Sequence, residues 1–158
     1  MISEELAAQL IKQNVNSNFS SEFLLPRLER LGGWASEQLA DEDFSELSKY
    51  TDEKELERLK SAIESLDKST KEWLKIRNCD VLSNTLLPYC FYNDEDASIR
   101  IGMQSTGYHA RYSMFKPHKK RFTCIYWVKF DLHPADQSEK WPITISSIQY
   151  YQFMKQIL

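Results

Sequence analysis

The segment from Arg121 to Leu132 constrains the fold of this chain more than any other segment. Every second side chain along it is apolar, and nothing interrupts the alternation. The apolar positions are Phe122, Cys124, Tyr126, Val128, Phe130 and Leu132. Because successive side chains of a strand point to opposite faces of a sheet, this pattern predicts a central β-strand with one face on the core. Trp127 and Lys129 would then lie on the opposite face.

The residues that precede this strand predict its partners. The expected elements, in chain order, are a short helix and an edge strand within 79–92, a polar turn at 93–96, strands at 98–104 and 109–115, and a basic turn at 116–120. Polar or proline-containing turns between short alternating segments are typical of hairpins. We therefore expect a small antiparallel sheet of three to four strands, in which 109–115 pairs with 121–132.

The C-terminal residues predict a helix that packs on this sheet. Ser146 is followed three residues later by Gln149, which is the spacing of a capping box. One helical face would then carry Ile148, Tyr151, Met154 and Ile157 or Leu158. A helix that covers the apolar face of an antiparallel sheet is a common α+β arrangement. The expected fold class is therefore α+β.

The first half of the chain reads as a series of helices. Ser3 precedes two acidic residues and an apolar stripe, which predicts a capped helix over about 4–14. Pro26 suits the first turn of a short helix at about 26–31, and Gly32-Gly33 would end it in a left-handed conformation. Residues 34–49 are expected to form one or two short helical turns.

The strongest helical pattern covers residues from about 52 to 77. No glycine or proline interrupts it, and its apolar positions step by three and four residues. These positions are Leu56, Leu59, Ile63, Leu66, Thr70 and Trp73. A seven-residue repeat can form a coiled-coil dimer, but fewer than four clean heptads, with Thr70 inside the stripe, favour packing on the same chain. We therefore expect one long helix and a monomer rather than a dimer.

Charge is divided unevenly between the two halves. Residues 1–77 contain 11 basic and 16 acidic residues, a net charge of −5, whereas residues 78–158 contain 9 basic and 7 acidic residues, a net charge of +2. No acidic residue occurs from Ala97 to Phe130. We therefore expect an acidic helical region at 1–77 and a basic sheet with its C-terminal helix at 78–158, folded as one compact unit. An uneven distribution of charge of this kind indicates which classes of partner the protein can attract.

Motifs for metals, cofactors and phosphates are missing from the sequence. The three histidines, His109, His118 and His133, lack the spacing of a zinc site, and the three cysteines form no C-x-x-C pair. The chain has four glycines, at positions 32, 33, 102 and 107, and this spacing excludes the G-x-G-x-x-G turn and the P-loop. We expect no metal, no cofactor and no complete catalytic set.

The location of the protein is also constrained by its composition. No run of apolar residues approaches the length of a membrane span, and residues 1–5 lack the basic start of a signal peptide. An odd number of cysteines suits reduced thiols better than a disulfide framework. A cytoplasmic protein without a membrane partner is expected.

The candidate binding surface is the polar face of the predicted sheet and the basic turn at one end of it. Its residues are Arg100, His109, Arg111, Lys116, Lys119, Lys120, Arg121, Trp127 and Lys129. Cations beside an exposed aromatic ring fit single-stranded nucleic acid, because the cations meet phosphates and the ring stacks on a base. The alternative is an ordinary solvated strand face, with Trp127 covered by the N-terminal helices and the positive charge neutralised by their acidic residues.

Three functions remain open at this point. The leading hypothesis is a non-catalytic binding module for a polyanion, RNA or single-stranded DNA. The second is a protein-binding inhibitor or toxin-neutralising immunity-type protein, because the helical half is acidic and acidic surfaces suit basic targets. The third is a small metal-independent RNase, with His109 and His118 as base and acid and Arg111 stabilising the phosphate.

Overall fold

A computed structural model describes residues 1–77, 80–113, 116–133 and 142–158. The helical elements are α1 (Glu4–Asn14), η1 (Ser21–Phe23), α2 (Leu24–Ala40), α3 (Phe44–Leu47), α4 (Glu53–Glu64) and α5 (Lys68–Glu72). The strands are β1 (Val81–Leu86), β2 (Phe91–Asn93), β3 (Ser98–Ser113), β4 (Lys116–Asp131), β5 (Ile143–Gln152) and β6 (Lys155–Gln156). The α+β class is therefore confirmed.

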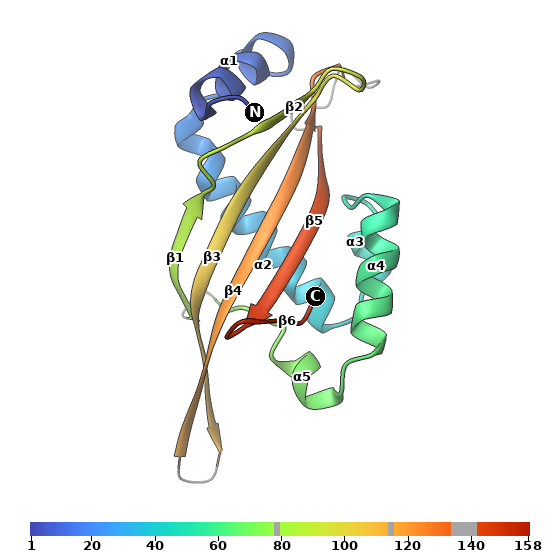
Figure 1. Ribbon diagram of the computed structural model, residues 1–158, viewed down its shortest axis with the longest axis vertical. Helices are drawn as coiled ribbons and strands as arrows, with labels where there is room; N and C mark the ends of the chain where they lie inside the picture. Colours follow the sequence, from blue (N-terminus) through green and yellow to red (C-terminus); the bar gives the residue numbers. More distant parts are fainter. Residues whose placement is uncertain (78–79, 114–115, 134–141) are drawn as a thin grey trace.

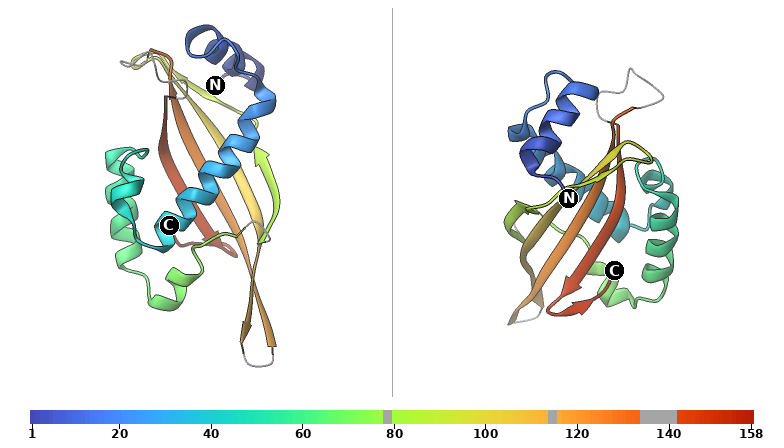
Figure 2. Two further views of the ribbon diagram at one scale, coloured as in Figure 1. Left: turned by 180° about the vertical axis from the view of Figure 1, so that it is seen from behind. Right: turned by 45° about the horizontal axis from the view of Figure 1, so that its top comes forward.

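The strands form one antiparallel sheet, and the helices pack against one of its faces. The strand order is β1-β3-β4-β5-β6, and β2 also pairs with β3, so the described sheet has six strands rather than the predicted three to four. Helix α2 crosses one face of the sheet, which we call the helix face (Figure 2). The opposite face, which we call the outer face, is turned to the viewer in Figure 1, with α4 beside β5.

Strand β4 forms as its alternation predicts. Phe122, Cys124, Tyr126, Val128, Phe130 and Leu132 are all buried, at most 6% exposed. Lys129 lies on the outer face, as expected. The prediction of a turn at 116–120 was wrong, because these residues belong to β4 and pair with β3.

The two strands expected at 98–104 and 109–115 are one continuous strand, β3. Gly107 lies between them and does not interrupt the ladder. A Cβ at this position would lie 1.9 Å from the carbonyl oxygen of Asp80, so the glycine allows the adjacent chain to approach closely. The whole of β3 therefore has one phase of alternation, with Ile99, Ile101 and Met103 in the core.

The predicted C-terminal helix was wrong, because residues 143–152 form strand β5. Trp127 pairs with Ser147 and Val128 pairs with Ile145, so Ser146 is an extra residue in a β-bulge. The bulge places both Ile145 and Ile148 in the core. Two buried residues three positions apart are also typical of a helix, and this spacing explains why a helix was predicted here. The Ser146 hydroxyl donates a hydrogen bond to the Trp127 carbonyl oxygen at 3.1 Å and caps no helix.

The helical half follows the sequence in part. Helix α1 forms as predicted, and the Ser3 hydroxyl accepts a hydrogen bond from the Leu6 amide. The single helix expected at 52–77 was wrong, since α4 ends at Glu64 and α5 begins at Lys68. The Asp67 carboxylate accepts a hydrogen bond from the Thr70 amide at 2.7 Å and so starts a new helix.

The segment 79–92 differs from its prediction in a similar way. The expected helix there is absent from the described residues, which form strand β1 from Val81 to Leu86. The expected edge strand is β2, which pairs with the beginning of β3. Both β1 and β2 are strands because their backbones hydrogen-bond to β3. The residue pattern within 79–92 alone does not show this pairing.

Helix α2 passes through Gly32-Gly33, where the sequence predicts a helix end. No glycine has a positive φ, so the left-handed stop is absent. A Cβ at Gly32 would lie 3.0 Å from the Tyr126 ring, whereas a Cβ at Gly33 would have no atom within 4 Å. Gly32 therefore brings α2 close to the sheet, and Gly33 leaves an open space beside it.

These two glycines provide a matched test of the packing. Gly33→Ala is expected to stabilise the protein by about 0.5–1 kcal/mol, because alanine is the better helix former and the space is free. Gly32→Ala is expected to destabilise it, because the added methyl group presses on the buried Tyr126 ring. Urea unfolding of both variants measures the difference. Equal stabilisation by the two substitutions would show that α2 does not rest on Tyr126.

Candidate nucleic-acid interface

The outer face collects five of the nine predicted binding residues. Core residues occupy odd positions of β3 and even positions of β4, so the outer face receives the other positions. Arg100 is directly opposite Lys129, Gly102 is opposite Trp127, and Tyr108 is opposite Arg121. The five residues on this face are Arg100, Lys119, Arg121, Trp127 and Lys129. Cations and aromatic rings therefore share one surface.

An aromatic cluster occupies one end of the outer face. The rings of Phe91 and Trp127 have their centroids 5.5 Å apart, and the Arg100 guanidinium lies 5.3 Å from the Phe91 centroid. A Cβ at Gly102 would come within 3.0 Å of the Trp127 ring, so glycine leaves the room that this ring occupies. Phe91 was not among the predicted site residues, because its position depends on the pairing of β2 with β3.

The charge at this same end is balanced. The Lys129 ammonium lies 3.3 Å from the Asp96 carboxylate. The Ser98 hydroxyl and then Lys129 hold the pKa of Asp96 below its usual value, so this carboxylate stays charged. A cavity of about 730 Å³ opens between these residues and the first turn of α4, and its lining includes both acidic and basic side chains. The net positive charge must therefore lie elsewhere.

The positive charge is concentrated on a two-stranded ribbon at the other end of the sheet. Strand β1 pairs with β3 only as far as Gly107, and β5 pairs with β4 only from Phe122 onward. Among the described residues, Tyr108–Ser113 and Lys116–Arg121 therefore form a ladder only with each other, and the Arg121 carbonyl oxygen at the base also accepts a hydrogen bond from the Phe153 amide at 3.2 Å. We call these two segments the basic ribbon, and Figure 1 shows it extending beyond the rest of the sheet.

The basic ribbon carries five basic residues and no acidic residue. The basic residues are Arg111, Lys116, Lys119, Lys120 and Arg121. Lys119 and Arg121 are exposed, and Tyr108 beside them is 43% exposed. Within the described part of the chain, neither Lys119 nor Arg121 forms an ion pair. These cations are therefore available to a partner.

Two other predicted site residues lie on the helix face. The Lys120 ammonium lies 4.7 Å from the centroid of the Trp73 ring. His109, which is directly opposite Lys120, is fully buried. The expectation that His109 shares a face with Trp127 was wrong, because the continuous strand β3 puts residue 109 in the core row. The backbone of Arg111 pairs with that of His118, in the next row of the ribbon.

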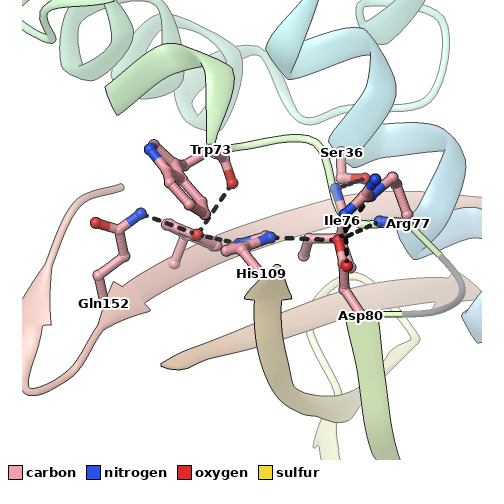
Figure 3. A network of polar contacts seen from close by, with 8 residues as sticks. Ser36, Trp73, Ile76, Arg77, Asp80, His109 and Gln152 are labelled. Atoms are coloured by element: carbon pink, nitrogen blue, oxygen red, sulfur yellow. Dashed lines mark hydrogen bonds and ion pairs between the residues drawn. The ribbon is translucent and has the colours of Figure 1, made fainter. Parts of the chain in front are cut away.

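His109 belongs to a buried polar network (Figure 3). Its Nδ1 lies 3.4 Å from a carboxylate oxygen of Asp80, and its Nε2 lies 2.5 Å from the Tyr150 hydroxyl. The Tyr150 hydroxyl donates to the Trp73 carbonyl oxygen at 3.1 Å, and Gln152 donates to the same hydroxyl at 3.2 Å. The His109 ring also stacks on Phe122, with centroids 4.4 Å apart. This network joins the base of the basic ribbon to β5 and to the α5 segment.

The position of His109 in this network does not favour a catalytic role. A general base must reach the proton that it removes, and His109 has no exposed surface. The RNase hypothesis therefore gains no support from the arrangement of His109. Asp80, the carboxylate of the network, also accepts two hydrogen bonds from the Arg77 guanidinium, at 3.1 and 3.3 Å.

The ionisation of Asp80 follows from these contacts. Burial alone raises the pKa of a carboxyl group, but the hydrogen bonds and charge of Arg77, with a smaller contribution from His109, outweigh burial. The pKa of Asp80 is therefore lowered from its usual value of 3.8. Its charged form stabilises the fold fully above pH 3.8, and this stabilisation is lost as the pH falls through the lower, folded-state value.

Asp80→Asn is expected to lower the free energy of unfolding by about 2 kcal/mol at neutral pH, because it removes charge-assisted hydrogen bonds. The difference from the unsubstituted protein should narrow only below pH 3.8, where Asp80 itself becomes protonated. Urea unfolding across a pH series measures this. Asp94→Asn, in an exposed turn, is the control and should change stability little. An Asp80→Asn difference that is already lost at pH 5 would contradict the assignment.

In the described ranges, no three His, Cys, Asp or Glu side chains gather closely enough to hold a metal ion. No helix among the described residues is long and apolar enough to cross a bilayer. Comparison of the chain with known protein families, curated proteins and solved structures found no match. The shape and charge of the surface are therefore the features that point to a function.

Proposed function

We propose that this protein binds RNA or single-stranded DNA along the basic ribbon and the adjoining outer face. The observation that carries the proposal is the basic ribbon, which extends beyond the sheet with five cations and no acidic residue. A strand of nucleic acid carries one phosphate per nucleotide, and Lys or Arg contacts to phosphate release its condensed counterions. Binding of this kind requires no catalytic residue.

The position of the acidic helices favours this proposal. Helix α2 crosses the helix face, and the outer face lies on the opposite side of the sheet (Figures 1 and 2). Lys120 lies on the helix side of the ribbon, where its charge helps to lower the pKa of Asp67, after the hydrogen bonds from Thr70. Lys119 and Arg121 are on the outer face and keep their charge for a ligand. Neutralisation within the molecule therefore affects the end of the outer face that holds Lys129 and Asp96, and it spares Lys119 and Arg121.

The outer face also offers rings on which bases can stack. Tyr108 lies directly across from Arg121, and Trp127 is half-buried further along β4. From Lys119 to Lys129 the strand rises by ~33 Å, at about 3.3 Å per residue, which spans several nucleotides. Stacking of a base on an aromatic ring contributes about 1–3 kcal/mol and tolerates any sequence. We therefore propose binding with little sequence preference.

The charge requirement is tested by the double variant Lys119→Ala/Arg121→Ala. Its affinity for a mixed-sequence single-stranded RNA should fall by about tenfold at low salt, because two phosphate contacts are lost. The slope of log K against log salt should become shallower by about 1.4. Fluorescence anisotropy with labelled RNA and DNA measures both quantities.

The matched control for charge is Lys12→Ala/Arg30→Ala, which removes two exposed cations from α1 and α2. It should leave the affinity within about twofold of the original value, because surface cations far from the ligand act only through screened fields. No binding by the unsubstituted protein at low salt would refute the proposal. Equal losses in the two double variants would refute the assigned surface.

The stacking requirement is tested separately by Tyr108→Ala. Loss of one stacked base should weaken binding by about 1–3 kcal/mol without changing the salt slope. Tyr89→Ala is the control, because Tyr89 is 55% exposed and lies between β1 and β2, outside the proposed path. Anisotropy titrations at two salt concentrations measure the effect. A loss in Tyr89→Ala as large as that in Tyr108→Ala would move the path to the β1–β2 edge.

A protein-binding inhibitor is the alternative that these titrations leave open if nucleic acid does not bind. Residues 1–77 carry a net charge of −5, and a surface of this sign suits a basic target. A pull-down from the native host, with and without nuclease treatment, separates the two functions. A partner that remains at equal stoichiometry after nuclease treatment would favour the inhibitor.

A further inference from the structure

A second cavity lies on the helix face, away from the basic ribbon and the outer face. It has a volume of about 390 Å³, is open to solvent on one side, and is lined by residues of α2, β1, β3 and β4. This volume falls within the usual range of small-molecule sites, about 300–1,000 Å³. Its walls are partly apolar, with Ile76, Val81 and Met103 among them.

The glycine pair of α2 keeps this cavity open. Both Gly32 and Gly33 line it. A Cβ at Gly33 would have no atom within 4 Å, so a side chain there would project into free space. Gly32 lies against the Tyr126 ring near Cζ, the carbon that bears the hydroxyl, at 3.1 Å from a built Cβ. Two glycines inside a helix cost stability, and here they leave space that larger residues would fill.

Asn84 lines the cavity and has an unsatisfied polar atom. Its Oδ1 is buried and accepts no hydrogen bond from any residue that the structure describes. The residue directly opposite is Ser105, which also lines the cavity, and its hydroxyl does not donate to Asn84. A buried acceptor without a partner costs about 1–3 kcal/mol, so such atoms are uncommon in native proteins. A ligand that donates a hydrogen bond at this position would remove the cost.

The remaining polar groups narrow the chemistry of the ligand. Among the described lining residues, Glu29 is the single charged side chain, and it is exposed at the α2 wall. Burial raises the pKa of Tyr126 well above its usual value, so its phenol stays neutral. The cavity thus combines one carboxylate, one free acceptor, hydroxyl groups and apolar walls. These groups suit a ligand that has a positively charged hydrogen-bond donor attached to a small apolar group.

We propose that this cavity binds a small organic amine, with its ammonium group toward Asn84 and Glu29 and its apolar body against Met103 and Val81. The site is independent of the proposed nucleic-acid surface, because no residue is shared between them. The ligand chemistry is a primary amine on an aromatic or branched aliphatic group.

The test uses three probes of similar size: phenethylamine, 2-phenylethanol and phenylacetate. Each is titrated into the full-length protein, and chemical shifts of backbone and Asn side-chain amides are followed by NMR. Phenethylamine should shift the resonances of Asn84, Ser105 and Gly33 with saturation in the millimolar range. Phenylacetate should shift none of them, because its carboxylate is repelled by Glu29 and cannot donate to Asn84.

Two variants then locate the site. Asn84→Leu keeps the size of the side chain and removes the acceptor, so phenethylamine should bind about tenfold more weakly. The same variant should have a higher melting temperature than the unsubstituted protein, because the unsatisfied oxygen is gone. Gly33→Leu should fill the cavity and abolish binding, whereas Arg30→Leu, its neighbour on α2, should leave binding unchanged.

Several results would overturn the proposal. These are phenylacetate binding as tightly as phenethylamine, no shifts with any probe, or unchanged phenethylamine binding in both Asn84→Leu and Gly33→Leu. A lower melting temperature in Asn84→Leu would show that Asn84 supports the fold and would overturn its role as a vacant acceptor. Nucleic-acid binding by the Gly33→Leu variant should equal that of the original protein, which separates this site from the proposed function.

Discussion

The pairing of β3 with β4 is the interaction on which the rest of the structure depends. The two strands are 16 residues each and remain in register from Ser98–Asp131 to Ser113–Lys116. One side of this ladder supplies the centre of the hydrophobic core, and the other side supplies the row of cations and rings. Both the core and the candidate surface therefore follow from one register. A slip of one residue would exchange the two faces and bury lysine and arginine.

The helices add asymmetry to this ladder. Helix α2 covers one face, while the opposite face holds Arg100, Trp127 and Lys129. At that end of the outer face, the first turn of α4 and the 93–96 turn bring acidic side chains beside the cations. Close packing of α2 on Tyr126 and the polar network around His109 hold the two layers together. Because the cover ends before the hairpin does, the two strands continue beyond it as the basic ribbon. The basic residues of the ribbon are thus kept apart from the acidic helical half because the β3–β4 hairpin is longer than the helix layer that covers it.

The sequence predicts some of this arrangement, and the failures have identifiable causes. Strand β4 was predictable because its alternation is local and unbroken. Strand β5 was not, because a bulge at Ser146 gives Ile145 and Ile148 a helical spacing. The helix break at Asp67 depends on a single side-chain cap, which competes with a continuous apolar stripe. Gly32 and Gly33 were misread as a stop because their contacts with the sheet are long-range.

The same reasoning explains the candidate site. Arg100, Trp127 and Lys129 were placed correctly because their positions follow from strands with a clear phase. His109 was misplaced because two strands were expected, at 98–104 and 109–115, and a separate strand has its own phase. Counted from Ile99 along one strand, residue 109 falls in the buried row. Phe91 and Asn84 belong to short strands whose faces are fixed only by pairing with β3.

The basic ribbon has a further consequence for the solution behaviour of the protein. In the described residues it pairs with no third strand, so beyond the Arg121 carbonyl, which Phe153 occupies, the backbone N–H and C=O groups along both of its edges face outward. Such edges can add strands from other molecules and lead to aggregation. Mutual repulsion between like-charged ribbons opposes that contact. A polyanion or high salt would weaken the repulsion, so the charges that attract a ligand also keep the molecules apart until the ligand arrives.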